Sequence, residues 1–179
     1  PNIKFARRIF NFNGGEGHFV AVMQRDGECE KSQAEGNFTR DKKTESIFKA
    51  FVDFYTENFL GTVPQNIVIG GDKVYIIPAN LNLKGVQVVR SGIFAGTVRN
   101  NRFIPEHSLF NNTQLVAKSV VELDIDDERV YKFLHGEEIT VDGTLKGYTQ
   151  VKINGIPCGF GKASNGTLKN HYPKGLRIL

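Results

Sequence analysis

Two Asn-Gly pairs near the end of the chain constrain the fold more than any other feature of the sequence. Gln150–Ile153 and Ile156–Phe160 are short β-prone segments that flank Asn154-Gly155, and a second pair, Asn165-Gly166, follows at once. Asn-Gly is the strongest short-range signal for a β-hairpin, because both residues accept the positive φ angles of a two-residue turn. The sequence therefore predicts consecutive antiparallel strands in this part of the chain.

Further short strands are expected ahead of these hairpins. Turn-forming residues such as Gly70-Gly71-Asp72 and Ser91-Gly92 separate runs that are rich in β-branched residues. The expected strands are His18–Gln24, Asn66–Ile69, Val74–Ile77, Val86–Arg90 and Ile93–Val98. Several short strands at this spacing, with one or two helical turns, are typical of a small mixed β-barrel.

One longer helix is expected around Ile47–Phe59. Apolar and aromatic side chains recur there at helical spacing, which places them on one face; they are Ile47, Phe48, Phe51, Phe54, Tyr55 and Phe59. Thr44 and Ser46 are candidate N-terminal caps, and Gly61 and Pro64 close the pattern. We interpret this segment as an amphipathic helix that packs on the core. A helix that binds a partner is the alternative.

Two shorter helices are expected further along the chain. Pro105 opens the segment PEHSLF, and proline is well placed at the first helical position. Asp124 or Asp126 can cap a second helix, Asp127–Leu134, which ends before Gly136. The acidic residues around this helix start complement the helix dipole, so capping explains them without a catalytic role.

Composition and motifs exclude several classes of function. The 179 residues are 40% hydrophobic and 23% charged, which is a globular composition, and the apolar runs are too short to span a bilayer. Cys29 and Cys158 match no metal motif, and the four histidines lack metal-ligand spacing. A glycine-rich turn, residues 14–17, precedes a strand, whereas a phosphate-binding loop follows one. We therefore expect no catalytic, cofactor-binding or metal-binding residue, no membrane contact, and a reducing cytoplasmic location.

The C-terminal stretch carries the sharper chemical signal. Gly159–Lys162 and Leu168–Arg177 interleave cations with Asn, His and Tyr, and Arg90, Arg99 and Arg102 add cations from the preceding strands. Lys and Arg can neutralise phosphates, an aromatic ring can stack on an unpaired base, and Asn can bond a base edge. From composition alone, an RNA-binding face and a solvated basic edge with Tyr172 in the core stay equally open.

Three segments resemble one protein family and favour the first of these readings. Ala6–Gly27, ARRIFNFNGGEGHFVAVMQRDG, resembles the closing motif of the Sun/Nop-type RNA cytosine-5 methyltransferase domain. Gly159–Arg177, GFGKASNGTLKNHYPKGLR, looks like the C-terminal signature of the RsmF-type branch. Between them, Val88–Phe110 is similar to the stretch that opens the PUA-like domain of that family.

The resemblance implies an α+β layout: a small linking domain followed by a PUA-like mixed β pseudobarrel with short helices. Residues 1–27 would be the last strand region of an upstream methyltransferase domain, 28–84 a linking domain with one main helix, and 85–179 the PUA-like RNA-binding domain. The implied function is the RNA-binding C-terminal module of a bacterial, S-adenosylmethionine-dependent rRNA 5-methylcytosine methyltransferase. It would position small-subunit rRNA for the upstream catalytic domain, which would hold the cofactor.

The resemblance does not carry catalysis onto this chain. The family uses two cysteines, in Pro-Cys and Thr-Cys contexts, for covalent attack on the pyrimidine ring and for product release. Pro157-Cys158 matches one context but falls inside the last domain. We treat this match as a coincidence and assign Cys158 no catalytic role.

A PUA-like pseudobarrel would present a basic groove between its strands and its short helices. Cations there would anchor phosphates, and Asn170 or Tyr172 would contact or stack on a base. The candidate RNA-binding residues are Arg90, Arg102, Lys162, Lys169, Asn170, Tyr172 and Lys174. The alternative is a protein-interaction or scaffold domain that docks through the Phe-rich helix without binding RNA. A stand-alone enzyme is disfavoured, because the sequence shows no cofactor loop, nucleophile pair or metal set.

Overall fold

The computed structural model of the protein describes residues 6–9, 18–21, 42–77 and 92–178. The chain forms two compact units, Pro1–Gln33 and Ala34–Leu179. In the first unit, β1 (Ala6–Ile9) pairs antiparallel with β2 (His18–Ala21). The strand expected at His18–Gln24 is confirmed over His18–Ala21, and its last residues lie outside the described part.

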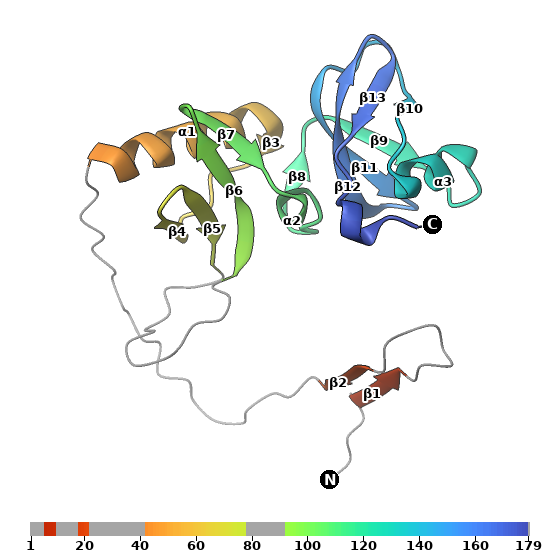
Figure 1. Ribbon diagram of the computed structural model, residues 1–179, viewed down its shortest axis with the longest axis horizontal. Coiled ribbons are helices and arrows are strands. Elements are labelled where there is room, and N and C mark those ends of the chain that lie inside the picture. Colours follow the sequence, from red (N-terminus) through yellow and green to blue (C-terminus); the bar gives the residue numbers. More distant parts are fainter. Residues whose placement is uncertain (1–5, 10–17, 22–41, 78–91, 179) are drawn as a thin grey trace. The chain divides into compact units, whose positions relative to one another are not determined.

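The second unit contains three helices, a 3-10 turn and eleven strands among its described residues (Figure 1). In chain order these are α1 (Lys42–Asn58), β3 (Phe59–Leu60), β4 (Ile67–Gly70), β5 (Lys73–Ile76), β6 (Ile93–Arg99), β7 (Arg102–Pro105), α2 (His107–Phe110), β8 (Val116–Ala117), β9 (Val120–Leu123), α3 (Glu128–His135), β10 (Ile139–Thr140), β11 (Gly147–Ile153), β12 (Ile156–Ser164), β13 (Thr167–Asn170) and the 3-10 turn Lys174–Leu176.

These strands form two main sheets. An antiparallel sheet has the order β4-β5-β6-β7, and a five-stranded sheet has the order β10-β13-β12-β11-β9, in which only β9 runs parallel to its neighbour. The five-stranded sheet is curled into a half-barrel (Figure 1). A short ladder joins β3 to β8. The α+β class with a mixed, curled β-sheet and short helices is therefore confirmed.

Positive φ angles at the turns explain why the hairpins form where they do. Asn154 and Gly155 have φ angles of 47° and 79°, and Asn165 and Gly166 have 50° and 77°, so both predicted Asn-Gly turns are confirmed. The hairpin across Gly70-Gly71-Asp72 is also present. A further turn at Asn100 and Asn101, with φ angles of 50° and 58°, joins β6 to β7. The sequence reading missed it, although Asn accepts this conformation better than other residues with a side chain.

The main helix confirms the amphipathic interpretation but not its predicted caps. Ile47, Phe51, Phe54 and Tyr55 are buried on one face of α1. Phe54 and Phe51 both pack on Phe103 of β7, with ring centroids 4.8 Å and 5.2 Å apart. The helix already begins at Lys42, because Lys42 and Lys43 are good helix formers, so Thr44 and Ser46 lie inside it and are not caps.

The two short helices also begin at other residues than expected. Pro105 is the last residue of β7, an edge strand that tolerates the missing N–H group, and Glu106 is the N-cap of α2. Asp127, rather than Asp124 or Asp126, caps α3, and its side chain accepts a hydrogen bond of 2.9 Å from the Arg129 amide. Gly136 ends α3 in the left-handed conformation, as predicted.

Two apolar cores hold the second unit together. The first joins α1, the four-stranded sheet and α2 to Phe160 of β12. The second packs α3 against the five-stranded sheet around Phe133, Val151 and Leu168. The four-stranded sheet takes β4 and β5 from before residue 84 and β6 and β7 from after it. The expected domain limits, 1–27, 28–84 and 85–179, stay predictions, and the strand expected at Val86–Arg90 lies outside the described residues.

Candidate nucleic-acid interface

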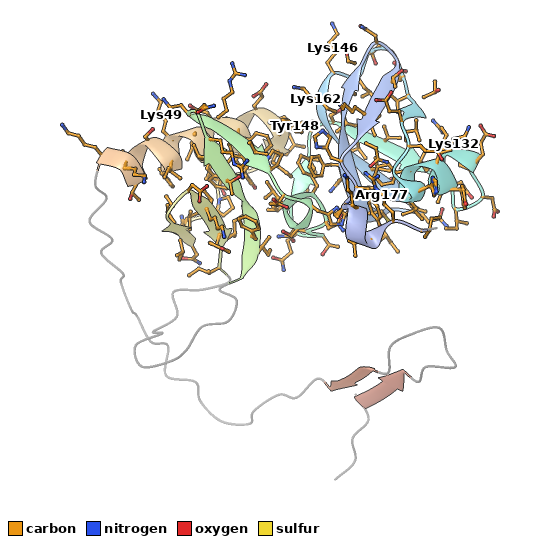
Figure 2. The ribbon with its side chains drawn as sticks, viewed as in Figure 1. Lys49, Lys132, Lys146, Tyr148, Lys162 and Arg177 are labelled. Atoms are coloured by element: carbon orange, nitrogen blue, oxygen red, sulfur yellow. The ribbon has the colours of Figure 1, made fainter. Side chains whose placement is uncertain are left out.

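Three neighbouring strands place an aromatic ring and two cations in one row. Lys162 on β12 lies directly opposite Tyr148 on β11 and opposite Lys169 on β13. Directly paired residues point to the same face of a sheet. The Lys162 Nζ atom lies 5.6 Å from the centre of the Tyr148 ring, within the range of a cation–π contact (Figure 2). Both lysines are exposed, so their charges face solvent.

The row borders two connected clefts. One, of about 870 Å³, is lined by Ala50, Asp53, Phe54, Glu57, Arg99, Asn100, Asn101, Arg102, Phe103, Ile104, Tyr148 and Lys162. The other, of about 420 Å³, is lined by Glu57, Asn58, Lys118, Ser119, Lys146, Gly147, Tyr148 and Lys162. Glu57, Tyr148 and Lys162 line both clefts, and we call the two together the groove.

The structure brings some of the predicted RNA-binding residues together and separates others. Arg102 and Lys162 line the groove, and Lys169 lies beside Lys162. Lys174 is exposed on the 3-10 turn Lys174–Leu176 and does not line the groove. Arg90 lies outside the described residues.

The side chain of Asn170 forms three hydrogen bonds within the protein. Its side-chain Nδ2 group donates to the carbonyl oxygens of Phe133, at 2.8 Å, and of Glu137, at 2.9 Å. Its Oδ1 atom accepts from the Tyr172 amide at 2.6 Å. Asn170 therefore ties β13 to the C-terminal end of α3 and to Glu137 just beyond it, and the Phe133 carbonyl oxygen also accepts from the Gly136 amide at 3.0 Å. Both of its amide hydrogens are engaged within the protein, which favours a structural role for Asn170 over a base contact.

Tyr172 belongs mainly to the core. Its ring centroid lies 5.5 Å from that of Phe133 and 5.3 Å from that of His107, which meets it edge to face. Burial raises the pKa of its hydroxyl. These contacts engage the ring within the protein, which favours the packing interpretation of Tyr172 over base stacking.

The sequence reading missed most of the residues that line the groove. Lys118 lies between β8 and β9, Lys146 directly precedes β11 and Tyr148 lies on β11, and no local motif marks them. The segment Arg99-Asn100-Asn101-Arg102 could have been found, because two Asn residues between two Arg residues are typical of a tight, basic turn.

His171 lies next to the row and is mostly uncharged at neutral pH. Its ring stacks on Phe160 with centroids 5.2 Å apart. Burial lowers the pKa of the imidazole, and the positive charges of Lys169 and Lys162 lower it further. At neutral pH the positive charge on this face therefore comes from the lysines rather than from His171.

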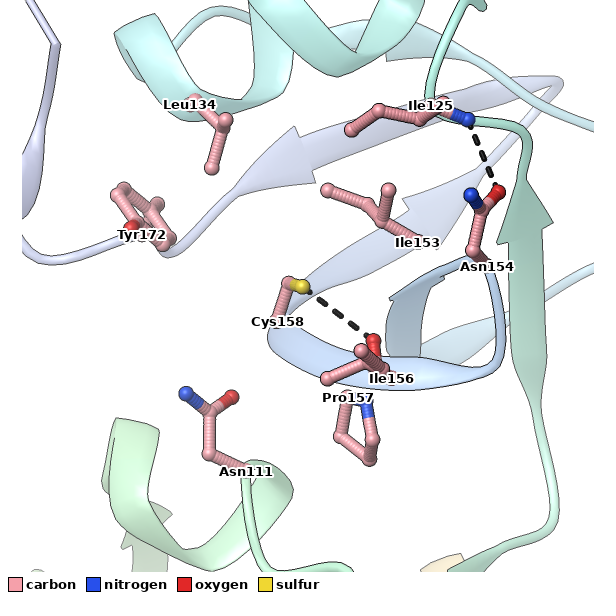
Figure 3. Close-up of a pocket in the computed structure, with 9 residues that line it drawn as sticks. All are labelled: Asn111, Ile125, Leu134, Ile153, Asn154, Ile156, Pro157, Cys158 and Tyr172. Atoms are coloured by element: carbon pink, nitrogen blue, oxygen red, sulfur yellow. Dashed lines mark hydrogen bonds between the residues drawn. The ribbon is translucent and has the colours of Figure 1, made fainter.

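Cys158 lies in a different, mainly apolar pocket of about 440 Å³ (Figure 3). Its Sγ atom donates a hydrogen bond of 3.3 Å to the Ile156 carbonyl oxygen, and Leu134, Ile153 and Tyr172 surround it. Burial raises the pKa of the thiol, which opposes formation of the nucleophilic thiolate. The surroundings of Cys158 therefore suit packing.

The described residues contain no group of three or more His, Cys, Asp or Glu that could hold a metal ion. None of the described helices is both long enough and apolar enough to cross a membrane.

Comparison with known protein families gives two matches in sequence order. Residues 53–110 match the first C-terminal domain of the RsmF rRNA methyltransferase, and residues 120–178 match the PUA domain of methyltransferase RsmF. A search of curated proteins found no match. A half-barrel with a basic groove and a PUA-family match define the RNA-binding part of an rRNA methyltransferase. More narrowly, the chain is a C-terminal portion of an RsmF-type methyltransferase, which confirms the resemblance to that family. Ala6–Gly27 lies outside both matches, and Val88–Phe110 falls within the match to the first C-terminal domain rather than at the start of the PUA domain.

Proposed function

We propose that this chain binds small-subunit rRNA in the cytoplasm and positions it for the methyltransferase domain of the same protein. That domain would form 5-methylcytosine. The observation that carries the proposal is the row of Tyr148, Lys162 and Lys169 beside a groove that also contains Arg99 and Arg102. Clustered cations neutralise backbone phosphates and release counterions, which supplies most of the affinity for RNA.

The cations of the groove have no carboxylate partners among the described residues. Among the described residues, the ion pairs within 4.0 Å are Arg129–Asp127, Lys132–Glu128 and His135–Glu137. All three lie around α3 and outside the groove. Lys162 and Lys169 are therefore not engaged in a surface ion-pair network. Exposed cations without partners at the rim of a groove favour an RNA-binding surface over a purely solvated edge.

S-adenosylmethionine would supply the methyl group in the catalytic domain. We assign it no residue of the described part. The role of the present chain is binding and orientation, which lower the entropic cost of bringing the target nucleotide to the reaction centre.

The competing scaffold function loses its main support in the structure. That function needs the aromatic face of α1 to be free for a partner, but Phe51 and Tyr55 are 0% and 2% exposed. Their rings belong to the core of this chain, together with Phe103 and Phe110.

A salt titration tests the proposed function. The chain should bind a structured fragment of small-subunit rRNA with an affinity that falls log-linearly with salt concentration. The double variant Lys162→Glu/Lys169→Glu should bind more weakly and with a shallower slope. Lys73→Glu/Lys152→Glu is the matched control, because it makes the same change in net charge at residues that do not line the groove. Equal losses of RNA affinity in both double variants would refute the placement of the RNA-binding surface at Lys162 and Lys169. If the chain bound no RNA at low salt, the proposed function itself would be refuted.

A further inference from the structure

We propose that the groove binds an unpaired RNA segment whose bases carry exocyclic amino groups. The phosphates would lie along its basic sides, and the bases would turn toward α1. This inference rests on the proposed function and adds to it the kind of RNA that the groove selects.

The acidic side of the groove is one face of α1. Ala50, Asp53, Phe54 and Glu57 line the groove and recur at helical spacing. Phe54 fixes this face in place, because its ring packs edge to face on Tyr148 with centroids 5.3 Å apart. Asp53 and Glu57 are exposed, so their carboxylates point into the solvent-filled space of the groove.

The basic sides come from the β6–β7 hairpin and from the region of the five-stranded sheet. Arg99 and Arg102 flank the Asn100-Asn101 turn between β6 and β7. Lys162 lies on β12 and Lys146 directly precedes β11 (Figure 2). Lys118 is tied to the end of α1, since its Nζ atom donates to the Thr56 carbonyl oxygen at 2.7 Å. Within the described residues no ion pair of 4.0 Å or less joins these cations to Asp53 or Glu57. Carboxylates and cations therefore line the same groove without pairing within 4.0 Å, which leaves both available to a ligand.

A groove with separate acidic and basic sides sorts the two parts of a nucleotide. Carboxylates repel phosphates, which keeps the RNA backbone away from α1 and on the side of Arg99, Arg102 and Lys162. The base then faces Asp53, Glu57 and the ring of Tyr148. Carboxylates accept hydrogen bonds from the amino groups of cytosine and adenine, whereas the O4 atom of uracil is itself an acceptor. The groove should thus prefer cytidine to uridine.

A duplex does not suit this arrangement. Its base edges are already paired, its deep major groove is closed to side chains, and it presents phosphates from two strands at once. One of those strands would meet the carboxylates of α1. The clefts have volumes in the range of small-ligand sites, which admit a flipped-out or looped nucleotide rather than a helix.

The test compares three RNA probes on the whole chain at one salt concentration: a short labelled oligocytidylate, an oligouridylate of the same length, and a blunt G·C duplex. We expect oligocytidylate to bind about tenfold more tightly than oligouridylate, since one charge-assisted hydrogen bond is at stake. The variant Asp53→Asn/Glu57→Gln should lose this preference, while its affinity for oligouridylate should stay equal or rise because repulsion is removed. Glu138→Gln, an exposed carboxylate that does not line the groove, is the control.

Several outcomes separate this inference from the function on which it rests. Equal affinity for oligocytidylate and oligouridylate would overturn the proposal that the groove recognises the amino groups of bases. Equal competition by the duplex would overturn the selection of unpaired RNA. In both cases RNA binding itself would stand. If no RNA binds at low salt, the proposed function fails as well, and a groove with both charges would then suit a peptide.

Discussion

The ammonium group of Lys162 on β12 lies 5.6 Å from the centre of the Tyr148 ring on the neighbouring strand β11. The ring holds a cation at the point where the two clefts of the groove meet. Tyr148 also contacts Phe54 of α1, so one side chain links the helix, the half-barrel and the candidate RNA contacts.

Replacement of Tyr148 should separate the role of the ring from that of the hydroxyl. Tyr148→Phe keeps the face over which Lys162 lies and should preserve RNA affinity. Tyr148→Leu should weaken RNA binding and lower the free energy of unfolding by roughly 1–2 kcal/mol, because aromatic packing on Phe54 is lost. RNA-binding isotherms and urea unfolding of both variants measure these effects. If the Leu variant bound RNA as tightly as the wild type, the ring would have no part in the interface.

Lys169 and Lys174 should contribute unequally to RNA binding. Neither lysine lines the groove, but Lys169 lies directly beside the groove residue Lys162 in the sheet, whereas Lys174 lies on the 3-10 turn Lys174–Leu176. Lys169→Ala should reduce the slope of log affinity against log salt by about one, as expected for one lost phosphate contact. Lys174→Ala should change that slope less. A larger effect of Lys174→Ala would move the interface toward the 3-10 turn.

Asp127 should make the stability of α3 depend on pH in the acid range. Hydrogen bonds from the side chain and the backbone amide of Arg129 lower the pKa of Asp127 from 3.8 to about 2. A carboxyl group whose pKa is lower in the folded state stabilises the protein at pH values above its ordinary pKa. This stabilisation is lost as the pH falls from about 4 to about 2. Asp127→Asn keeps a good N-cap but cannot ionise.

Thermal unfolding between pH 2 and pH 5 measures this effect. The melting temperature of Asp127→Asn should depend less steeply on pH than that of the wild type. Asp126→Asn, which changes a neighbouring carboxylate that does not cap the helix, is the control. Parallel pH profiles for the wild type and Asp127→Asn would contradict the assignment.

Gln150 is a buried polar link between β11 and the end of α2. It is 0% exposed, and its Nε2 group donates to the Phe110 carbonyl oxygen while its Oε1 atom has no partner. Gln150→Glu should lower the free energy of unfolding by roughly 3–5 kcal/mol at neutral pH, because it buries an unpaired charge. The pKa of that glutamate would be raised in the folded state. The loss should therefore shrink as the pH falls toward about 4.3, the ordinary value for Glu.

Gln150→Leu is the matched variant for this prediction. It removes the unpaired Oε1 atom together with the donor, so it should cost less than Gln150→Glu at neutral pH and show no such pH dependence. Denaturant unfolding at two pH values compares the three proteins. Equal stability of the Glu and Leu variants would mean that water reaches this position.

Features fixed by local backbone preference could be predicted from the sequence. Asn154-Gly155 forms its turn because the two residues accept positive φ, and Gly136 ends α3 for the same reason. Spacing alone identified the buried face of α1, since Phe51 and Phe54 follow helical periodicity.

Features that depend on tertiary packing could not be predicted. The groove joins Asp53 to Arg102 and Lys162, which are far apart in the chain, and no local pattern encodes their meeting. Asn170 is of a residue type that can contact a base, but in the folded chain its side-chain amide donates to the Phe133 carbonyl oxygen of α3. Pro105 suited a helix start in isolation, and its pairing with Gly96 made it the end of a strand instead.

The core that α1 shares with β12 makes the two family-matched regions depend on each other for folding. The border between the two family matches lies at residues 111–119, yet Phe110 before it stacks on Phe160 after it with centroids 4.5 Å apart. A chain divided at that border would leave aromatic surface open to water on both halves. The two matched regions are therefore expected to fold as one unit, and either half made alone should be less stable than the whole. For the same reason the binding surface at their junction is assembled during folding, before any RNA arrives.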